Sequence, residues 1–398
     1  MKLAYFGYPH IGGTYSVFRH LRTGLAGARI ELRWLGCGPY AHAAAASSMF
    51  RAERDHGDTV GRPDDDDYAR TRAVVRAVED GFDGVFVNVL ADPVQTNAVR
   101  YLDPRILRIM IVHNITPGTY AAARAIRDHV HATVGVSPRI QADLVRRYGF
   151  QRDRTVAIPN GIDIAGLALA RPERTSKGLR VLYLGRVEDQ AKGVLWLPRI
   201  FRELPPSITL TVAGDGPDLA RLKARCAALG SRVQFRGAVA PSLIGRLLAE
   251  HDVLLMPSRF EGLGLTLVEA MAAGCVPVAS HIQGVTDLSV EDGVNGFLFP
   301  VGDTRSAARA IIRLAEDEAG RVEMAARASR KARDRFGIPL MAERYRDLID
   351  SLRYSQPAVA PPLDLSGWRL PSGLKPGLRT YLPKSLKNAL RTLRERQA

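Results

Sequence analysis

The chain has 398 residues, more than one hydrophobic core usually accommodates, so two domains are expected. Hydrophobic residues make up 46% and charged residues 24%, as in an ordinary soluble globular protein, and no apolar run reaches the length that spans a bilayer. The net charge of +15 would suit nucleic acid, an anionic membrane or acidic small molecules, but no nucleic-acid-binding motif accompanies it, so no nucleic-acid partner is expected.

The cysteines and the N-terminal residues of the sequence indicate where in the cell the protein is expected. Cys37, Cys226 and Cys275 are far apart and make neither a metal-ligand spacing nor a disulfide framework, which favours a reducing cytosol. The first 13 residues lack the apolar segment of a signal peptide. A cytoplasmic location is therefore expected.

The first half of the chain alternates apolar strand patterns with helix patterns. A glycine loop at residues 10–13 follows the first strand, and residues 41–60 match no element clearly. Strands are expected at residues 3–8, 30–35, 84–90, 106–112, 133–136 and 156–158. This alternation predicts a doubly wound parallel sheet.

Two features of this half have competing interpretations. The four aspartates at residues 64–67 resemble a metal site, but they precede a helix pattern, and acidic residues near a helix N-terminus are favourable without any ligand. His113 follows a buried strand, where it is well placed for a ligand or, equally, for hydrogen bonds to loop backbone. The helix start is favoured for the aspartates, and both interpretations of His113 stay open.

A second alternating series follows residues 166–178, which have little hydrophobic pattern and are interpreted as a linker. Strands are expected at residues 179–184, 208–213, 233–235, 252–257 and 275–279, and within 292–300. A long basic helical stretch is expected over residues 304–335. The second half therefore also predicts a doubly wound sheet.

Residues 258–280 combine a glycine loop with two carboxylates. Glu261 and Glu269 have seven residues between them, in the order strand, loop, helix, strand. In a parallel sheet this loop lies at the carboxyl edge, where ligands bind, and helix N-terminal amides suit a phosphate. A carboxylate accepts hydrogen bonds from sugar hydroxyls, so a ligand with both parts is indicated. The alternative is that both glutamates are solvated surface charges.

The last part of the chain contains a helix pattern at residues 341–352, a Pro/Gly-rich stretch and a basic amphipathic pattern over residues 382–396. From residue 357 to 398, eight Lys/Arg and two Asp/Glu give a charge of +6. Such a helix is typical of membrane-surface or partner-binding segments, and docking on the body of the protein is an equal alternative.

The ordered motifs resemble the retaining glycosyltransferases of family 4 (group 1). The spacing of Glu261 and Glu269 matches their signature, and other matches are the glycine loop, His113, PNGID at 159–163, Gly185 and Arg186 with Lys192, and GDGP at 214–217. Residues 284–287 depart from the pattern, because the family commonly has a proline and a glutamate there. The resemblance covers residues 1–350 and implies the GT-B fold, in which two Rossmann-like, doubly wound α/β domains face one another across a cleft.

The resemblance also implies a domain plan. The N-terminal Rossmann-like domain would hold the acceptor and the C-terminal one the nucleotide-sugar donor, and residues 339–355 would cross back to the N-terminal domain. The expected ranges are 1–165 for the N-terminal domain, 166–178 for the linker, 179–338 for the C-terminal domain, 339–355 for the crossing helix and 356–398 for the basic tail.

Site roles follow from the same resemblance. The implied catalytic residues are Arg186, Lys192, Glu261 and His113. The implied donor-binding residues are Gly12, Gly13, Gly262, Gly264, Leu265 and Glu269. Cationic side chains would neutralise the diphosphate, so neither a metal nor another cofactor is expected.

The expected function is that of a hexosyltransferase in polysaccharide biosynthesis. It would move a sugar from a nucleoside-diphosphate sugar to a saccharide or lipid-linked acceptor, with retention. The basic residues 382–396 would meet an anionic membrane, which makes the inner face of the cell membrane a candidate location. The alternatives are a GT-B-fold nucleotide-sugar epimerase and a catalytically silent nucleotide-sugar-binding protein.

Overall fold

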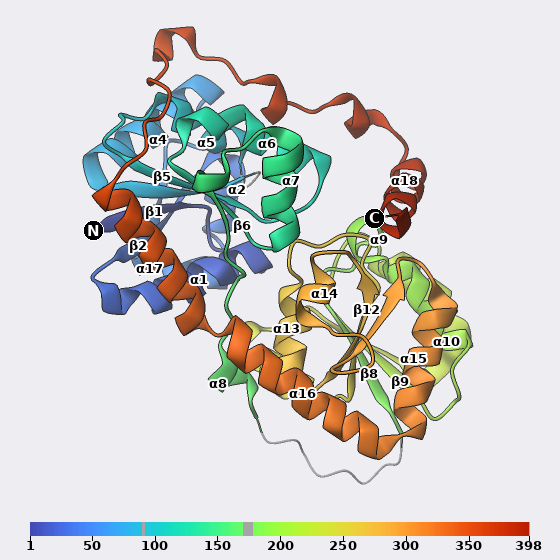
Figure 1. Cartoon of the computed structure of the whole chain (residues 1–398). Helices are drawn as coiled ribbons and strands as arrows, with labels where there is room; N and C mark the ends of the chain where they lie inside the picture. Colours follow the sequence, from blue (N-terminus) through green and yellow to red (C-terminus); the bar gives the residue numbers. More distant parts are fainter. Residues whose placement is uncertain (90–91, 170–177, 398) are drawn as a thin grey trace. The chain divides into compact units, whose positions relative to one another are not determined.

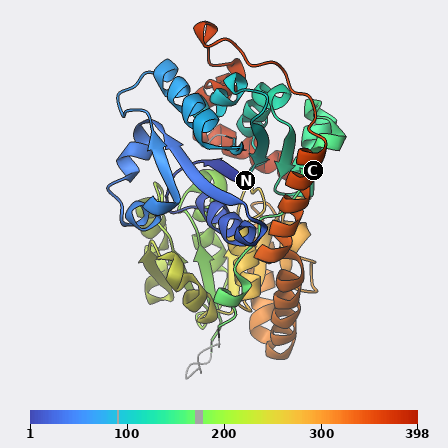
Figure 2. The same cartoon turned by 90° about the vertical axis from the view of Figure 1, so that its left-hand side faces the viewer.

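The computed structural model describes residues 1–89, 92–169 and 178–397. The chain forms two compact units (Figure 1). The first unit contains Met1–Gly161 and Ile338–Tyr381, and the second contains Ile162–Gly337 and Leu382–Ala398. Each unit is built on one parallel β-sheet, with helices on both of its faces in Figures 1 and 2.

In the described part of the first unit, seven parallel strands lie in the order β3-β2-β1-β4-β5-β6-β7. The strands are β1 (Lys2–Phe6), β2 (Glu31–Cys37), β3 (Gly57–Val60), β4 (Gly84–Asn88), β5 (Leu107–Val112), β6 (Ala132–Gly135) and β7 (Thr155–Ala157). Every residue of β4 and β5 is buried, as expected for central strands covered on both faces. The edge strand β3 lies in the stretch that the sequence pattern left unassigned.

The helices of the first unit follow the expected alternation, with two additional short helices between β2 and β3. They are α1 (Gly13–Leu25), α2 (Gly38–Ala44), α3 (Ser48–Glu53), α4 (Asp67–Gly81), α5 (Pro93–Ala98), α6 (Pro117–Ile126), α7 (Pro138–Tyr148) and α17 (Ile338–Tyr354). The aspartate run begins α4, because the Asp66 carboxylate accepts a hydrogen bond of 2.7 Å from the amide of Ala69. The helix-start interpretation of this run is therefore confirmed.

Helix α17 belongs to the first unit although it is distant in sequence. It packs against α1, and a methyl group added at Gly24 of α1 would lie only 2.5 Å from the Cβ of Ala342. The buried ring of Tyr345 stacks edge-on against Phe86 of β4 at 5.5 Å between centroids. The helix expected over residues 339–355 therefore forms part of the first unit's core.

In the described part of the second unit, six parallel strands lie in the order β10-β9-β8-β11-β12-β13. The strands are β8 (Arg180–Leu184), β9 (Thr209–Ala213), β10 (Val233–Gly237), β11 (Val253–Met256), β12 (Val276–His281) and β13 (Phe297–Pro300). Helices α13 and α16 cover one face of this sheet, and α10 and α15 cover the other (Figure 1).

The helices of the second unit are α8 (Ile164–Leu167), α9 (Asp189–Lys192), α10 (Leu197–Arg202), α11 (Leu219–Cys226), α12 (Ile244–Ala249), α13 (Leu265–Ala272), α14 (Thr286–Ser289), α15 (Thr304–Glu316), α16 (Glu318–Phe336) and α18 (Lys384–Gln397). The basic stretch expected as one helix is broken between α15 and α16. Asp317 causes the break, since its non-helical backbone ends α15 and its carboxylate caps α16 by accepting from the amide of Gly320 at 2.8 Å.

The domain boundary lies nearer the N-terminus than the sequence predicts. The second unit starts at Ile162, and helix α8 packs on α12 and α13 of that unit, so the range 1–165 was too long. Residues 170–177 of the expected linker lie outside the described residues. The PNG turn at 159–161, rather than the expected linker, marks the change from one unit to the other.

The tail is not one segment, as the sequence pattern implied. Residues 356–381 lie on the first unit, where the indole of Trp368 donates to the hydroxyl of Thr71 at 2.8 Å and the amide of Leu363 donates to the carbonyl of Arg100 at 2.9 Å. Helix α18 belongs instead to the second unit. The three cysteines are buried, and none of them forms a disulfide bond.

Candidate active site

The second sheet brings two loops together at its centre. Strands β8 and β11 are neighbours, and the strand order reverses between them, so the loops after β8 and β11 flank a topological switch point. Ligands of open α/β sheets bind at such points, outside the carboxyl ends of the strands. Arg186 and Lys192 follow β8, and Glu261 follows β11.

Lys192 and Glu261 form an ion pair across these two loops. Nζ of Lys192 lies 2.5 Å from Oε1 of Glu261, and the buried hydroxyl of Ser258 donates to the same oxygen at 2.7 Å. The other oxygen, Oε2, has no hydrogen-bond partner among the described residues and is not buried. One oxygen therefore holds the pair and the other is available to a ligand.

Gly193 lets the two loops approach closely. Its φ of +60° is left-handed, and a Cβ there would lie 2.1 Å from the carbonyl oxygen of Pro257. The amide of Arg259 also donates to the carbonyl of Ala191 at 2.7 Å. Gly193 and Ser258 thus position the ion pair, and a glycine just after the Lys192 helix was the sequence signal that would have pointed to it.

Arg186 lies at the same sheet edge without joining the ion pair. Its side chain is exposed and has no hydrogen bond or ion pair within the described parts of the chain, whereas its carbonyl accepts from the hydroxyl of Tyr183 at 2.6 Å. The backbone before it is crowded, because a Cβ at Gly214 would lie 1.9 Å from the carbonyl oxygen of Gly185. The backbone of the loop after β8 is therefore held in place, while the guanidinium of Arg186 has no partner among the described residues.

The glycine loop after β11 is joined to helix α13 by Gly264, whose backbone has the left-handed conformation. Gly264 has a φ of +82° and precedes Leu265, the first residue of α13, and Gly262 is buried in the same loop. The first amides of a helix have no intrahelical acceptor and suit a phosphate group. The glycine loop therefore leaves the first amides of α13 without intrahelical acceptors at the carboxyl edge of the sheet.

Glu269 lies one turn into α13 and differs electrostatically from Glu261. Its carboxyl is half-buried, it accepts no hydrogen bond in the described residues, and burial raises its pKa to about 7. A carboxyl in this state is poised between its neutral and ionised forms at neutral pH. Hydroxyl donors of a ligand would favour the ionised form.

In the first unit, His113 is held by a hydrogen-bond chain at the end of the central strands. The amide nitrogen of Asn88 donates to the carbonyl of Phe6 at 2.6 Å, and its Oδ1 lies 2.8 Å from Nε2 of His113. Nε2 therefore carries the proton, and Nδ1 is left as an acceptor. Burial lowers the pKa of His113 to about 4, so the ring is neutral at neutral pH.

Asn88 is a candidate site residue that the sequence motifs did not indicate, because it orients His113. It is the last residue of the buried strand β4, and a polar residue at that position was the available signal. The loop interpretation of His113 is incomplete, because the partner of Nε2 is a side chain rather than loop backbone.

The glycine loop of the first unit follows β1, which adjoins β4 at that sheet's own switch point. Gly12 has an extended backbone, and a Cβ there would lie 2.8 Å from the His10 ring. Gly13 begins α1, and His10 contacts the hydroxyl of Thr14 at 3.1 Å. The small residues keep this backbone open beside the histidine.

The predicted site residues thus divide between the units. The second unit holds Arg186, Lys192, Glu261, Gly262, Gly264, Leu265 and Glu269, and the first holds Gly12, Gly13 and His113. Direct contact joins Lys192 to Glu261. Across the residues described, no group of three or more His, Cys, Asp or Glu is arranged to hold a metal ion.

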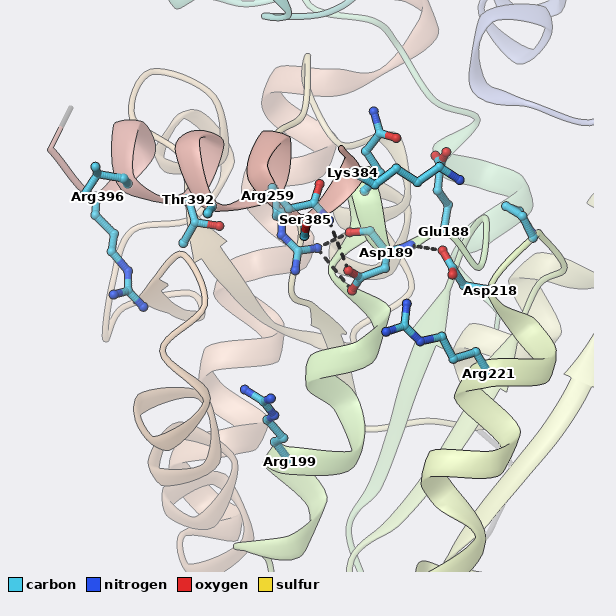
Figure 3. Close-up of a pocket in the computed structure, with 15 residues that line it drawn as sticks. Glu188, Asp189, Arg199, Asp218, Arg221, Arg259, Lys384, Ser385, Thr392 and Arg396 are labelled. Carbon is cyan, nitrogen blue, oxygen red and sulfur yellow. Dashed lines mark hydrogen bonds and ion pairs between the residues drawn. The ribbon is translucent and has the colours of Figure 1, made fainter. Parts of the chain in front are cut away.

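A cavity of about 700 Å³ lies in the second unit, next to the two loops that carry Lys192 and Glu261 and beneath helix α18 (Figure 3). Asp189, the first residue of the Lys192 helix, and Arg259 form an ion pair of 3.2 Å at its wall. Basic side chains predominate among its charged lining, with Arg199, Arg221, Arg259, Lys384 and Arg396 against Glu188, Asp189 and Asp218. No sequence motif indicated this cavity.

Comparison with solved structures identifies proteins with the same fold. The chain superposes on the Anabaena protein Alr3699/HepE, solved in complex with UDP and glucose, with a TM-score of 0.74 at 20% identity, covering 88% of this chain and 100% of that one. Sucrose-phosphate synthase from Thermosynechococcus elongatus gives 0.73 at 19% identity, covering 89% and 100%. At these identities the likeness concerns the fold.

The two Rossmann-like units, each with its loops at a switch point, define the GT-B class of glycosyltransferase folds. The family model "Glycosyl transferases group 1" matches residues 178–317 of this chain. The resemblance inferred from the sequence motifs is confirmed.

Sequence relatives agree with this family. A phosphatidyl-myo-inositol mannosyltransferase of Mycolicibacterium smegmatis is 33% identical over 199 residues, which are 48% of this chain and 51% of the relative. The chain therefore spans about half the length of this curated relative.

Proposed function

We propose that the protein is a retaining glycosyltransferase that moves a hexosyl group from a nucleoside-diphosphate sugar to a saccharide or lipid-linked acceptor. The observation that carries the proposal is the Lys192–Glu261 ion pair at the switch point, with an uncommitted guanidinium and an uncommitted carboxylate oxygen beside it. Cations and hydroxyl acceptors at one sheet edge suit the two halves of such a donor.

In this proposal, cationic side chains stabilise the leaving group. As the glycosidic bond breaks, negative charge grows on the distal phosphate, and Arg186 and Lys192 would neutralise it together with the first amides of α13. Because the Lys192 charge is already fixed by Glu261, little reorganisation is required when the phosphate charge develops. Neither a metal ion nor another cofactor is part of the proposed reaction.

The acceptor oxygens of the site would hold the hydroxyl groups. Oε2 of Glu261 would accept from the transferred sugar, and the Glu269 carboxylate would accept from the ribose. Nδ1 of His113 would accept from a sugar hydroxyl, a role that needs the neutral ring indicated by its low pKa. The extended backbone at Gly12 and Gly13 would allow a close approach of the donor.

One experiment separates this function from its alternatives. The protein is incubated with UDP- and GDP-hexoses, with and without saccharide and polyprenyl-phosphate saccharide acceptors, in buffer containing EDTA. Nucleotide release that depends on acceptor, with the donor's anomeric configuration preserved in the product by NMR, is expected. A changed sugar without release would indicate an epimerase, binding alone would indicate a silent protein, and restoration by Mn²⁺ only would refute metal independence.

We also propose that residues 382–396 act at an anionic membrane surface. Helix α18 exposes a row of leucines, Leu386, Leu390 and Leu393, with about half of each residue accessible (45%, 51% and 54%). Leu393 also lines the edge of the cavity beneath the helix. The helix carries five Lys/Arg against one glutamate. No described helix is long and apolar enough to span a bilayer.

Vesicle binding tests the membrane proposal. Co-sedimentation with phosphatidylglycerol vesicles is expected to fall sharply in the triple Leu→Ser variant of this row, and Leu363→Ser, at an exposed leucine of the first unit, is expected to bind like wild type. Equal binding by the triple variant would refute the proposal. Loss of concentration-dependent self-association in the variant, without loss of vesicle binding, would assign the row to a second copy of the chain.

A further inference from the structure

Helix α18 touches both segments that carry the Lys192–Glu261 pair. The side-chain amide of Asn388 donates to Oδ2 of Asp189 at 3.4 Å, and Asp189 is the first residue of the helix that ends at Lys192. The guanidinium of Arg391 lies 4.4 Å from the centroid of the Phe260 ring, and Phe260 immediately precedes Glu261. One helix near the end of the chain therefore contacts both sides of the ion pair.

These two segments are coupled beneath α18. Arg259 pairs with Asp189 at 3.2 Å, and its guanidinium stacks 4.0 Å from the centroid of Trp196. Oδ1 of Asp189 also accepts from the amide of Leu195 at 3.1 Å. Figure 3 shows Arg259 and Asp189 joined below the helix. A displacement of Asp189 or Phe260 would therefore also displace Lys192 or Glu261, because only a few covalent bonds separate them.

The other end of α18 is fixed to a third loop. Nε of Arg396 donates to the carbonyl of Val301 at 2.8 Å, and a Cβ at the next residue, Gly302, would lie 2.9 Å from the Trp196 ring. The side chains of α18 that make these attachments are polar, and Leu386 and Leu390 are absent from the lining of the cavity beneath the helix, whereas Leu393 lies at its edge. The helix is therefore held mainly by polar contacts, in contrast to ordinary amphipathic packing.

We propose that α18 is a positioning element of the donor site. In this proposal Asn388 and Arg391 hold α9 and the loop before Glu261 in fixed positions relative to each other. The assignment of a donor to this site rests on the proposed function; the positioning of the two segments does not. Without these contacts, Lys192 and Glu261 sample more arrangements, and the donor must order them on binding. Donor affinity then falls more than turnover.

The test compares the double variant Asn388→Ala, Arg391→Ala with the conservative variant Arg391→Lys, each in the full chain. Arg394→Ala is the matched control, an arginine of the same helix for which no ion pair or ring contact is present in the described residues. For the double variant Asn388→Ala, Arg391→Ala we expect KM for the sugar nucleotide to rise about threefold to tenfold with a smaller change in kcat. Arg391→Lys keeps a cation over the ring and should restore most of the affinity.

Hydrogen exchange measured by mass spectrometry separates this proposal from the proposed function. Peptides covering residues 186–196 and 257–265 should exchange faster in the double variant, while a peptide covering β5 and the Arg394→Ala protein should match wild type. Unchanged exchange in those two peptides would overturn the positioning role, whatever the activity. The two proposals can also fail separately. If the double variant exchanges faster but the wild-type protein neither binds nor turns over any sugar nucleotide, the positioning role stands and the proposed function is refuted.

Discussion

At the scale of single residues, each unit has polar atoms at its own switch point that form no hydrogen bond within the described residues. Glu261 uses one carboxylate oxygen for Lys192 and Ser258 and leaves the other open, and His113 commits only Nε2. Such half-committed groups are already oriented, so a ligand completes their hydrogen bonds without reordering them. Pre-orientation of this kind reduces the entropic cost of binding.

Lys192 is expected to contribute to both stability and turnover. Lys192→Ala removes a cation that faces the developing phosphate charge, so kcat should fall about 100-fold or more. It also leaves the nearly buried Glu261 without its ion-pair partner, which should cost about 1–3 kcal/mol of stability. The double substitution Lys192→Ala, Glu261→Gln should recover the stability, measured by thermal denaturation, but not the turnover.

An exposed lysine of the tail, in Lys375→Ala, supplies the control and should change neither quantity. A Lys192→Ala protein that is folded and turns over normally would remove this lysine from the donor site.

Glu269 is expected to make donor affinity depend on pH. Because its pKa is raised to about 7 and a ribose hydroxyl needs the ionised acceptor, affinity for a nucleoside-diphosphate sugar should rise about tenfold between about pH 6 and about pH 8. The diphosphate of such a sugar does not titrate in this interval. Calorimetry on wild type and Glu269→Gln measures the effect, and the variant should bind weakly at every pH with a flat profile.

Without ligand, the same carboxyl affects stability with the opposite sign. Its folded pKa exceeds the ordinary glutamate value, so the folded state holds the proton more tightly and loses stability as pH rises from about 4 to about 7. Glu269→Gln should abolish this loss in thermal denaturation. If the difference in stability between the wild type and Glu269→Gln were the same at every pH, the raised pKa of Glu269 would be contradicted.

At the scale of secondary-structure elements, short polar signals decide where helices begin. The Asp66 carboxylate caps α4, and Asp66→Ala should destabilise the first unit by about 1 kcal/mol because the amide of Ala69 loses its acceptor. Asp64→Ala is the control, since Asp64 makes no capping hydrogen bond in the described residues. Equal thermal midpoints for the two variants would contradict the capping role.

The elements with strong periodicity were predictable, and those defined by tertiary contacts were not. The buried runs of β4 and β5 and the glycine loop before α13 follow from local pattern. Strand β3 has the sequence GDTV, which carries too little hydrophobic pattern to be recognised, and its place depends on pairing with β2. The amphipathic pattern of residues 382–396 left membrane binding and docking on the protein as equal alternatives, and the contacts that hold α18, such as that of Asn388 with Asp189, join residues far apart in sequence.

At the scale of the whole molecule, the sequence predicts the fold better than the site geometry. Two alternating series of strands and helices were sufficient for two Rossmann-like units, because the period of each pattern is local. The Lys192–Glu261 contact depends on the close approach at Gly193, and the orientation of His113 depends on Asn88, a residue 25 positions away in sequence. Such long-range pairings leave no periodic signal in a single sequence.

The division of the chain at 161, 337 and 381 has a consequence for how the protein emerges from the ribosome. N-terminal domains generally fold first during synthesis. Here the first unit cannot close its core until α17 has been translated, since Tyr345 of α17 packs on Phe86. The main body of the second unit is made before that point, so it can complete its sheet while the earlier half of the polypeptide still waits for its last helix. The nascent first unit would then be the part that depends on chaperones.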